Sequence, residues 1–228
     1  MGALDELRAE VALGCRILGF EDHGDFVWGH VSARDPDGRG VWMKASTYGF
    51  DEIGREQVIL VSWEGEVLEG EAKRHSEFPI HTELMRARED VGAVVHTHAP
   101  WSVAFASTEQ PLRPISHDGT LFVPPDMARF TLTGDLILTL ELGRELAAVV
   151  GGRNAALMVH HGIVTCGVDV PTAVMTAVFL ERACRANMRA LAAGGPRTWS
   201  SDTEALAKRE HVYSPQLAWD YLARRLRA

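Results

Sequence analysis

The segment Val94–Pro100, with the sequence VVHTHAP, constrains the fold and the chemistry of this chain more than any other. Alternate residues of a β-strand point to the same face, so His96 and His98 project together from the end of an apolar strand. Two further histidines, His160 and His161, follow another apolar run later in the chain. Three imidazoles that leave a coordination position open are typical of a catalytic zinc-type site, whereas structural zinc sites are closed.

The composition is that of a soluble globular protein. The chain has 228 residues, of which 46% are hydrophobic and 24% charged, and this predicts one domain over residues 1–228. No apolar run is long enough for a transmembrane helix, and the N-terminal residues lack the layout of a signal peptide. A net charge of −8 argues against a nucleic-acid partner. The three cysteines, Cys15, Cys166 and Cys184, are widely spaced, which favours buried thiols in a reducing cytoplasm.

Hydrophobic spacing predicts helices packed on a sheet. We expect helices over Leu4–Leu18, Ser76–Asp90, Glu141–Val150, Asp169–Leu191 and Asp202–Arg227. Short β-prone pieces punctuated by Gly, Asp and Pro lie between Phe26 and Val67, and another strand-like piece spans residues 119–123. The short connections in the first third of the chain favour antiparallel pairing. The predicted fold class is therefore α/β.

Four segments carry a resemblance to the class II aldolase/adducin family. They are GHVSAR at 29–34, SEFPIH at 76–81, VVHTHA at 94–99 and HHGIV at 160–164, and their order and spacing are also similar. The resemblance extends from about residue 4 to residue 191. It implies a three-layer α/β/α sandwich around a largely antiparallel sheet. It also implies a homotetramer with active sites between neighbouring subunits, and a divalent metal ion held by three histidines.

The family motifs assign candidate roles to individual residues. The metal ligands would be His96, His98 and His161, the last being the residue immediately before the glycine of the fourth segment. Glu77 matches the family's acid/base carboxylate, which can also be a fourth metal ligand. Because neighbouring strand positions point to opposite faces, His160 is expected in the core or behind the ligands. Zinc is the first expectation for the metal, and manganese, cobalt and iron are alternatives.

This set of residues suits reactions that leave negative charge on a carbon next to a carbonyl group. Neutral imidazoles leave the ion its full positive charge, which would stabilise a metal-bound enolate. Retro-aldol cleavage, decarboxylation and epimerisation share that intermediate, and the residues do not choose among them. Glu77 could remove or return the proton.

Three positions depart from the sugar-phosphate aldolases of the family, which bind phosphate through small donor residues. His30, Tyr48 and His75 stand at the corresponding positions and would fill the phosphate pocket. The pattern is more similar to a branch with non-phosphate substrates, which includes metal-dependent decarboxylases of hydroxylated aromatic or pyridine dicarboxylates. In such a site His30, His75, Lys44 or Arg34 would bind a second carboxylate of the substrate.

Two other regions resemble segments that complete the site in the family. The segment Ile115–Gly119 lies where the aldolases carry a proton-donating tyrosine, and it offers His117 and Asp118 as catalytic groups instead. Residues near the C-terminus often reach a neighbour's active site, which makes Tyr213 a candidate for substrate binding.

The leading functional hypothesis is a cytoplasmic, metal-dependent carbon–carbon lyase that decarboxylates a small hydroxylated carboxylate, aromatic acids included. One alternative is a class II aldolase acting on a small hydroxy-carbonyl compound or a sugar phosphate. An alternative of another class is a non-catalytic, adducin-like interaction module, although such members tend to lose the histidines. An iron oxygenase that uses the same three histidines is a third alternative.

Overall fold

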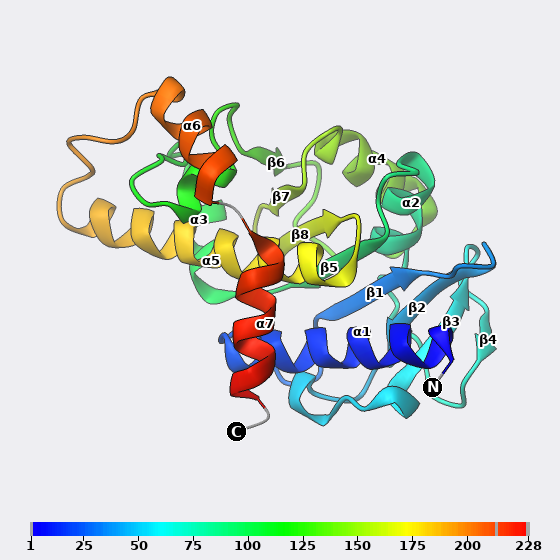
Figure 1. The fold of residues 1–228 in the computed structure, drawn as a ribbon. Helices are drawn as coiled ribbons and strands as arrows, with labels where there is room; N and C mark the ends of the chain where they lie inside the picture. The colour runs from blue at the N-terminus through cyan, green and yellow to red at the C-terminus, as the bar shows by residue number, and fades with distance from the viewer. Residues whose placement is uncertain (1, 213, 227–228) are drawn as a thin grey trace.

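A computed structural model describes residues 2–212 and 214–226. In this structure an eight-stranded sheet has the strand order β4-β3-β2-β1-β5-β8-β7-β6, and helices lie on both of its faces (Figure 1). Every neighbouring pair of strands is antiparallel except β6 and β7, which are parallel. The predicted α/β/α sandwich around a largely antiparallel sheet is therefore confirmed.

The first four strands form the predicted meander, and β5 then returns to pair with β1. The strands are β1 (His30–Arg34), β2 (Gly40–Lys44), β3 (Val58–Ser62), β4 (Val67–Glu69), β5 (Ala93–Thr97), β6 (Ala128–Phe130), β7 (Ala155–Met158) and β8 (Gly162–Gly167). Because β1 and β8 run antiparallel to β5, both begin at the sheet edge where β5 ends.

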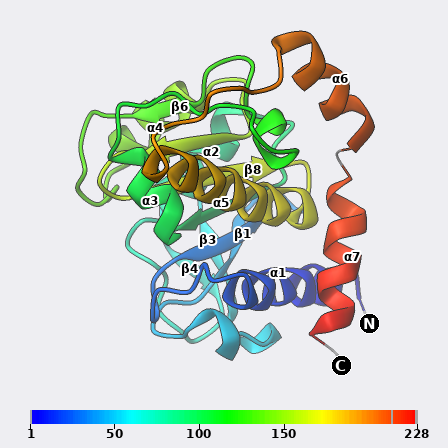
Figure 2. The ribbon, with the colours of Figure 1, turned by 90° about the vertical axis from the view of Figure 1, so that its left-hand side faces the viewer.

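The helices divide between the two faces of the sheet (Figures 1 and 2). They are α1 (Ala3–Phe20), α2 (Pro79–Ala87), α3 (Pro100–Ala106), α4 (Leu140–Val150), α5 (Val170–Ala192), α6 (Asp202–Val212) and α7 (Pro215–Arg225). The apolar core on one face takes side chains from α1, α3, α5 and α7, and the core on the other face takes them from α2 and α4. Among the described residues, no helix is long and apolar enough to cross a membrane.

The alternation of side chains along β5 decides which face carries the first histidine. Val95 lies in the core beneath α1 and α5, whereas Val94 lies in the core beneath α2 and α4. Since residues two apart share a face, His96 points to the α2 side of the sheet. The strand ends one residue later, so His98 lies just beyond the sheet edge.

Strand β1 places two further polar residues beside His96. Val31 lies in the core beneath α1 and α5, so His30 and Ser32 point to the α2 face. The β1–β5 register pairs His30 directly with His96. Antiparallel pairing therefore brings together histidines that are far apart in the sequence.

Two of the predicted elements differ from the structure. Helix α2 begins at Pro79 rather than Ser76, because proline is well suited to the first helical position and Ser76 lies in the preceding turn. The expected strand over 119–123 is wrong, since Asp118–Leu121 forms a 3-10 helix, η3. The Thr120 hydroxyl donates a hydrogen bond to the carbonyl oxygen of residue 117 at 2.7 Å, which stabilises the tight turn.

The expected single helix over the tail is also wrong. Helix α7 starts at Pro215, and the Ser214 hydroxyl caps it by accepting a hydrogen bond from the Leu217 N–H. A serine cap followed by proline is a strong helix start, and it separates α7 from α6.

Candidate metal centre

Four ligand atoms, one each from Glu77, His96, His98 and His161, lie within 4.8 Å of one another. We call these residues the metal cluster. His96 comes from the end of β5, His98 from the residues after it, and His161 from the turn between β7 and β8. Glu77 lies in the turn before α2. The geometry therefore gathers the four residues at the edge of the sheet where these elements meet.

Hydrogen bonds fix the orientation of two of the rings. The His96 Nδ1–H donates to the Ile163 carbonyl at 2.9 Å, and the His98 Nδ1–H donates to the Asp25 carboxylate, also at 2.9 Å. In a neutral imidazole this leaves both Nε2 atoms unprotonated. The two Nε2 atoms face each other at 3.1 Å. A cation between them would satisfy both lone pairs, so the cluster suits a metal ion.

The other two members of the cluster support the same conclusion. Both ring nitrogens of His161 are buried without a hydrogen-bond partner in the described part of the chain, although Nε2 lies 3.5 Å from Glu77 Oε1. Burial alone would raise the pKa of Glu77, but His161, His96 and the Ile137 N–H, which donates to Oε1 at 2.8 Å, outweigh it and lower the pKa to about 2. The cluster therefore combines an ionised carboxylate with an unpartnered imidazole, which is a donor set for a divalent cation.

The backbone of the turn between β7 and β8 allows His161 to lie close to His96 and His98. His160 has a φ of +63°, a conformation that L-residues rarely adopt. Strand β8 starts at Gly162, where a Cβ atom would lie 2.9 Å from the His98 ring and 3.3 Å from the His96 ring. The expectation that His160 lies in the core is wrong, because it occupies the exposed turn rather than a strand.

The cluster opens onto a cavity of 370 Å³. Its lining residues are Asp25, Trp28, Gly29, His30, His75, Ser76, Glu77, His98 and Leu136. A second cavity, of 410 Å³, shares Asp25, His98 and Leu136 with the first and continues past His160 and His161. Cavities of this size are suited to small molecules.

A second group of polar residues includes two that line the first cavity, His30 and His75, and three that lie behind them. We call Ser32, Lys44, His75, His81 and His30 the inner group; all are buried. The Lys44 Nζ donates to the Val27 carbonyl at 2.9 Å, to the Ala45 carbonyl at 3.3 Å and to His75 Nε2 at 3.3 Å. All three of its N–H bonds are therefore used within the chain.

The charge of Lys44 has no counter-ion close to it. Burial lowers the pKa of Lys44 to about 8, so the ammonium group is charged at neutral pH. Within residues 2–212 and 214–226, no carboxylate lies within 4.0 Å of it. Direct contact with a substrate would break one of the three hydrogen bonds of Lys44. Its positive charge, by contrast, can attract an anionic substrate without any such contact.

The histidines of the inner group are neutral and hydrogen-bonded. Burial, together with the nearby charge of Lys44, lowers the pKa of His75 to about 3. His30 Nδ1 lies 2.6 Å from His81 Nε2, and the pKa of His30 lies well below its usual range because of burial and the neighbouring histidines. The ring centroids of His30 and His75 are 4.4 Å apart, so the two imidazoles together form one part of the cavity wall.

Arg34 and Tyr48 lie outside the cavity. The Arg34 guanidinium donates to the carbonyls of Met85, Arg88 and Val91 and so joins β1 to the end of α2. Its expected contact with a substrate carboxylate is therefore wrong. Tyr48 is partly buried and packs against both cores.

Two predicted site residues, His117 and Asp118, are not brought to the cluster within the described chain. Asp118 accepts a hydrogen bond from Arg182 on α5 at 3.3 Å, on the face opposite α2, and neither Asp118 nor His117 lines the two cavities. Tyr213 lies outside the described residues. Any contact of His117 or Asp118 with the cluster therefore needs a neighbouring chain.

The structure also adds residues that the sequence analysis missed. Asp25 orients His98, Trp28 lines the cavity, and His81 connects His30 to Ser32. His81 follows Glu77 by four residues and so would have shared a face with it on the expected helix, which was an available signal. Nothing in the spacing of Asp25 or Trp28 pointed to the site.

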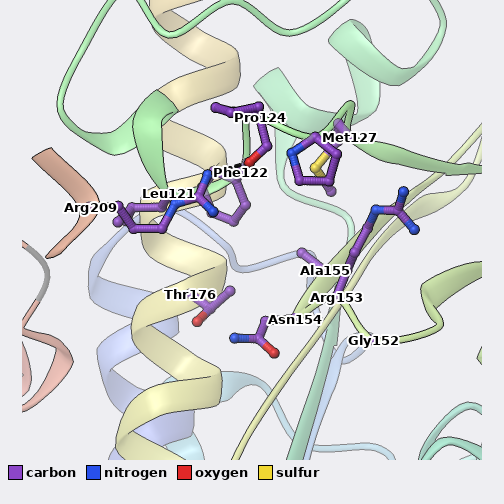
Figure 3. Close-up of a pocket in the computed structure, with 11 residues that line it drawn as sticks. Leu121, Phe122, Pro124, Met127, Gly152, Arg153, Asn154, Ala155, Thr176 and Arg209 are labelled. Atoms are coloured by element: carbon purple, nitrogen blue, oxygen red, sulfur yellow. Dashed lines mark hydrogen bonds between the residues drawn. The ribbon is translucent and has the colours of Figure 1, made fainter. Parts of the chain in front are cut away.

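A larger cavity, of 540 Å³, lies apart from the cluster among η3, β7, α5 and α6 (Figure 3). It has an apolar lining that includes Leu121, Phe122 and Met127, with Arg153 and Arg209 on opposite sides. The Arg209 guanidinium donates to the carbonyls of residues 120 and 124. Its lining contains no histidine or carboxylate, so the candidate for metal chemistry is the smaller cavity.

A donor set for one divalent cation at the edge of an antiparallel sheet, within an α/β/α sandwich, defines a class of metal-dependent α/β proteins. The family described as the class II aldolase and adducin N-terminal domain matches residues 9–188. The chain belongs to this family.

Individual relatives are similar over most of the chain. The decarboxylase NovR of Streptomyces niveus is 30% identical over 206 residues, which are 89% of this chain and 75% of that protein. The 3,4-dihydroxyphthalate decarboxylase of Arthrobacter keyseri is 28% identical, covering 97% of this chain and 94% of that protein. Among solved structures, an L-fuculose 1-phosphate aldolase from Glaciozyma antarctica PI12 is 26% identical with a TM-score of 0.83, covering 97% and 86% of the two chains.

Proposed function

We propose that this protein is a metal-dependent carbon–carbon lyase that decarboxylates a small hydroxylated aromatic carboxylate. The observation that carries the proposal is the pairing of a complete metal-ligand set with a cavity lined by His30 and His75, where the buried Lys44 ammonium contacts His75. The similarity to two decarboxylases supports it. The similarity to an aldolase supports the coarser assignment to carbon–carbon lyases.

In this proposal His96, His98 and His161 hold the ion, and Glu77 faces it. When bound, a divalent cation supplies positive charge next to a chelating hydroxyl and carboxylate, and so stabilises negative charge that develops on the substrate. Zinc is the first choice for three imidazoles, and manganese, cobalt or iron would also suit them.

Glu77 moves the proton. It is ionised at neutral pH because its pKa is about 2. Its Oε2 takes the proton of the substrate hydroxyl that chelates the cation. The protonated Glu77 then gives this proton to the ring carbon that carries the carboxylate. The bond between that carbon and the carboxylate breaks, carbon dioxide leaves, and the electron pair moves into the ring and leaves negative charge on the hydroxyl oxygen. That oxygen takes up one proton from solvent, so the net change replaces a carboxylate by hydrogen with uptake of one proton.

The inner group favours substrates of a particular charge. A buried ammonium without a counter-ion is costly, and an anionic group in the cavity would offset that cost. Lys44 therefore favours a substrate that carries a second negative charge. The imidazoles at 30 and 75 occupy the space that a phosphate would need, which favours carboxylates over sugar phosphates.

We further propose a cytoplasmic homotetramer with its active sites between subunits. The buried thiols of Cys15, Cys166 and Cys184 suit a reducing compartment. In the assembly His117 and Asp118 of one subunit, with Tyr213, would complete the cavity of a neighbour as catalytic and substrate-binding groups.

The experiment is a metal analysis of the purified protein followed by measurement of carbon dioxide release from hydroxylated benzoates and phthalates. We expect one divalent ion per chain and a loss of turnover when a chelator removes it. Turnover of sugar phosphates alone would contradict the decarboxylase proposal and favour a class II aldolase. Metal-free protein without any lyase activity would favour the adducin-like interaction module, and oxygen consumption on addition of Fe(II) and substrate would favour an oxygenase.

A further inference from the structure

The larger cavity, of 540 Å³, has no part in the proposed metal chemistry, and its wall combines apolar and positively charged side chains. Leu121, Phe122 and Met127 contribute apolar surface. The charged residues of the lining are Arg153 and Arg209, which lie on opposite sides of the cavity (Figure 3). The wall therefore has an apolar middle between two positive groups.

The backbone fixes the Arg209 guanidinium at one side of this cavity. Its Nε–H donates to the Thr120 carbonyl at 2.8 Å, and its Nη2 donates to the Pro124 carbonyl at 2.6 Å. A guanidinium group has further N–H bonds beyond the ones used here. Arg209 Nη1 has no hydrogen-bond partner among the described residues. The side chain is therefore held in one orientation and can still donate to a ligand.

Neither arginine of this cavity is paired with a carboxylate within the described chain. In residues 2–212 and 214–226, no carboxylate oxygen lies within 4.0 Å of the guanidinium nitrogens of Arg153 or Arg209. Arg209 is partly buried, and burial lowers its pKa because a charge away from water is less stable. An anion beside a partly buried charge is attracted more strongly than it would be in water. The two arginines therefore favour an anionic ligand.

We propose that this cavity is a second binding site, which takes an elongated molecule with an apolar middle and a carboxylate at each end. One carboxylate accepts hydrogen bonds from Arg209, and the other pairs with Arg153. The carbon chain between them packs against Leu121, Phe122 and Met127. Cavities of this volume are suited to small molecules. The wall contributes no residue of the metal cluster, so the site does not depend on the proposed decarboxylase activity.

Calorimetry with suberate and octanoate tests this ligand class, because the two acids have carbon chains of the same length and differ in the second carboxylate. We expect one suberate to bind per chain, about threefold more tightly than octanoate, since an exposed ion pair contributes modestly. The affinity should be the same with and without zinc. Equal affinities for the two acids, or no saturable binding of either, would overturn the proposal. An affinity that requires zinc would place the probe at the metal cluster, which would also overturn it while leaving the lyase assignment intact.

Substitutions of the two arginines separate the ends of the site. Arg153→Met should abolish the preference for suberate and leave octanoate binding unchanged, and this exposed position is not needed for the fold. Arg209→Met should weaken the binding of both acids by about tenfold, because it removes hydrogen bonds to a charged group. Arg224→Met, at an exposed position of α7, is the matched control and should change neither affinity. Suberate binding that is the same in both cavity variants as in the unaltered protein would contradict us.

The methyl groups of methionine report where the probe binds. In protein labelled with 13C at these methyls, suberate should shift the signal that is missing from Met127→Leu. The signals of Met43 and Met85, in the core beneath α2 and α4, should stay unchanged. Shifts of other methionines alone would place the probe elsewhere and overturn the proposal. A change in the number of chains per particle in either arginine variant, measured by light scattering, would mean that acidic groups of another copy occupy the cavity instead of a small dicarboxylate.

Discussion

The metal cluster and the inner group share a cavity wall, and their hydrogen bonding is opposite. In the metal cluster, the Nε2 atoms of His96 and His98 face each other at 3.1 Å and both nitrogens of His161 lack partners. In the inner group, every N–H of Lys44 has an acceptor, and one of these acceptors is His75 Nε2. The metal cluster therefore needs a ligand from outside the protein chain, whereas most hydrogen bonds of the inner group are made within it.

The largest expected effect is the loss of metal from the cluster. In His96→Ala one of three imidazole ligands is missing, so we expect the bound metal to fall from one per chain to none and turnover to fall by roughly a thousandfold or more. Metal analysis and carbon dioxide release measure the two losses. The matched control is His160→Asn at the adjoining turn, because asparagine tolerates the positive φ of that position. Full turnover by His96→Ala would contradict a metal mechanism.

A smaller loss of affinity is expected when the group that orients His98 is removed. Asp25 accepts the Nδ1–H of His98, and such partners typically contribute a factor of about 10 to 100 in metal affinity. Asp25→Ala should therefore weaken zinc binding by about that factor in a competition titration with a chelator. Asp37→Ala removes an exposed carboxylate elsewhere and serves as the control. Unchanged zinc affinity would show that Asp25 does not help His98 to bind the metal.

The Lys44→Met variant should affect the inner group and leave the metal cluster unchanged. The cost of a buried ammonium and the value of its three hydrogen bonds oppose each other, so the free energy of unfolding should change by less than about 1 kcal/mol. Zinc affinity should stay the same, while the KM for an anionic substrate should rise about tenfold because the nearby charge is gone. Lys73→Met at an exposed position is the control. A fall in zinc affinity would show that Lys44 also contributes to the metal cluster, which would contradict the separation of the two groups.

The smallest effect concerns the dependence of stability on pH. Burial lowers the pKa of His23 and His81 to about 3, from 6.5. Between these pH values the unfolded chain binds protons that the folded chain does not, so stability falls as the pH drops from about 6.5 towards 3. Each of the two histidines contributes up to about 1.4 kcal/mol per pH unit to this fall.

Urea titrations of metal-free protein between pH 7 and pH 4 would measure this slope. His81→Gln should reduce it by about one proton, whereas His211→Gln, at an exposed position of α6, should leave it unchanged. A slope that is the same in His81→Gln would mean that His81 is already protonated in the folded protein, which would contradict the neutral inner group.

The sequence predicted much of the fold because local signals agree with the tertiary structure. The antiparallel sheet and the long helix ending near Leu191 both follow from apolar spacing and caps. The spacing of His96 and His98 likewise predicted that their rings would approach one another, since both lie near the end of a strand whose period is two residues.

What the sequence did not predict depends on contacts between distant segments. Asp25 meets His98 only because the loop before β1 passes the end of β5, and no spacing pattern records that. Arg34 looked like a free cation, but it is used by three carbonyls at the end of α2. The expected strand at 119–123 was overturned by a local hydrogen bond from Thr120, which a pattern of apolar residues does not contain.

The central claim is that the imidazoles of His96, His98 and His161 share one divalent cation. X-ray absorption spectroscopy of the zinc-loaded protein, together with the zinc content per chain, tests it most directly. We expect one zinc per chain, with about three nitrogen ligands at roughly 2.0–2.1 Å and the remaining ligands oxygen. Zinc bound through sulfur, or binding that is equally tight in His96→Ala and His161→Ala, would contradict it.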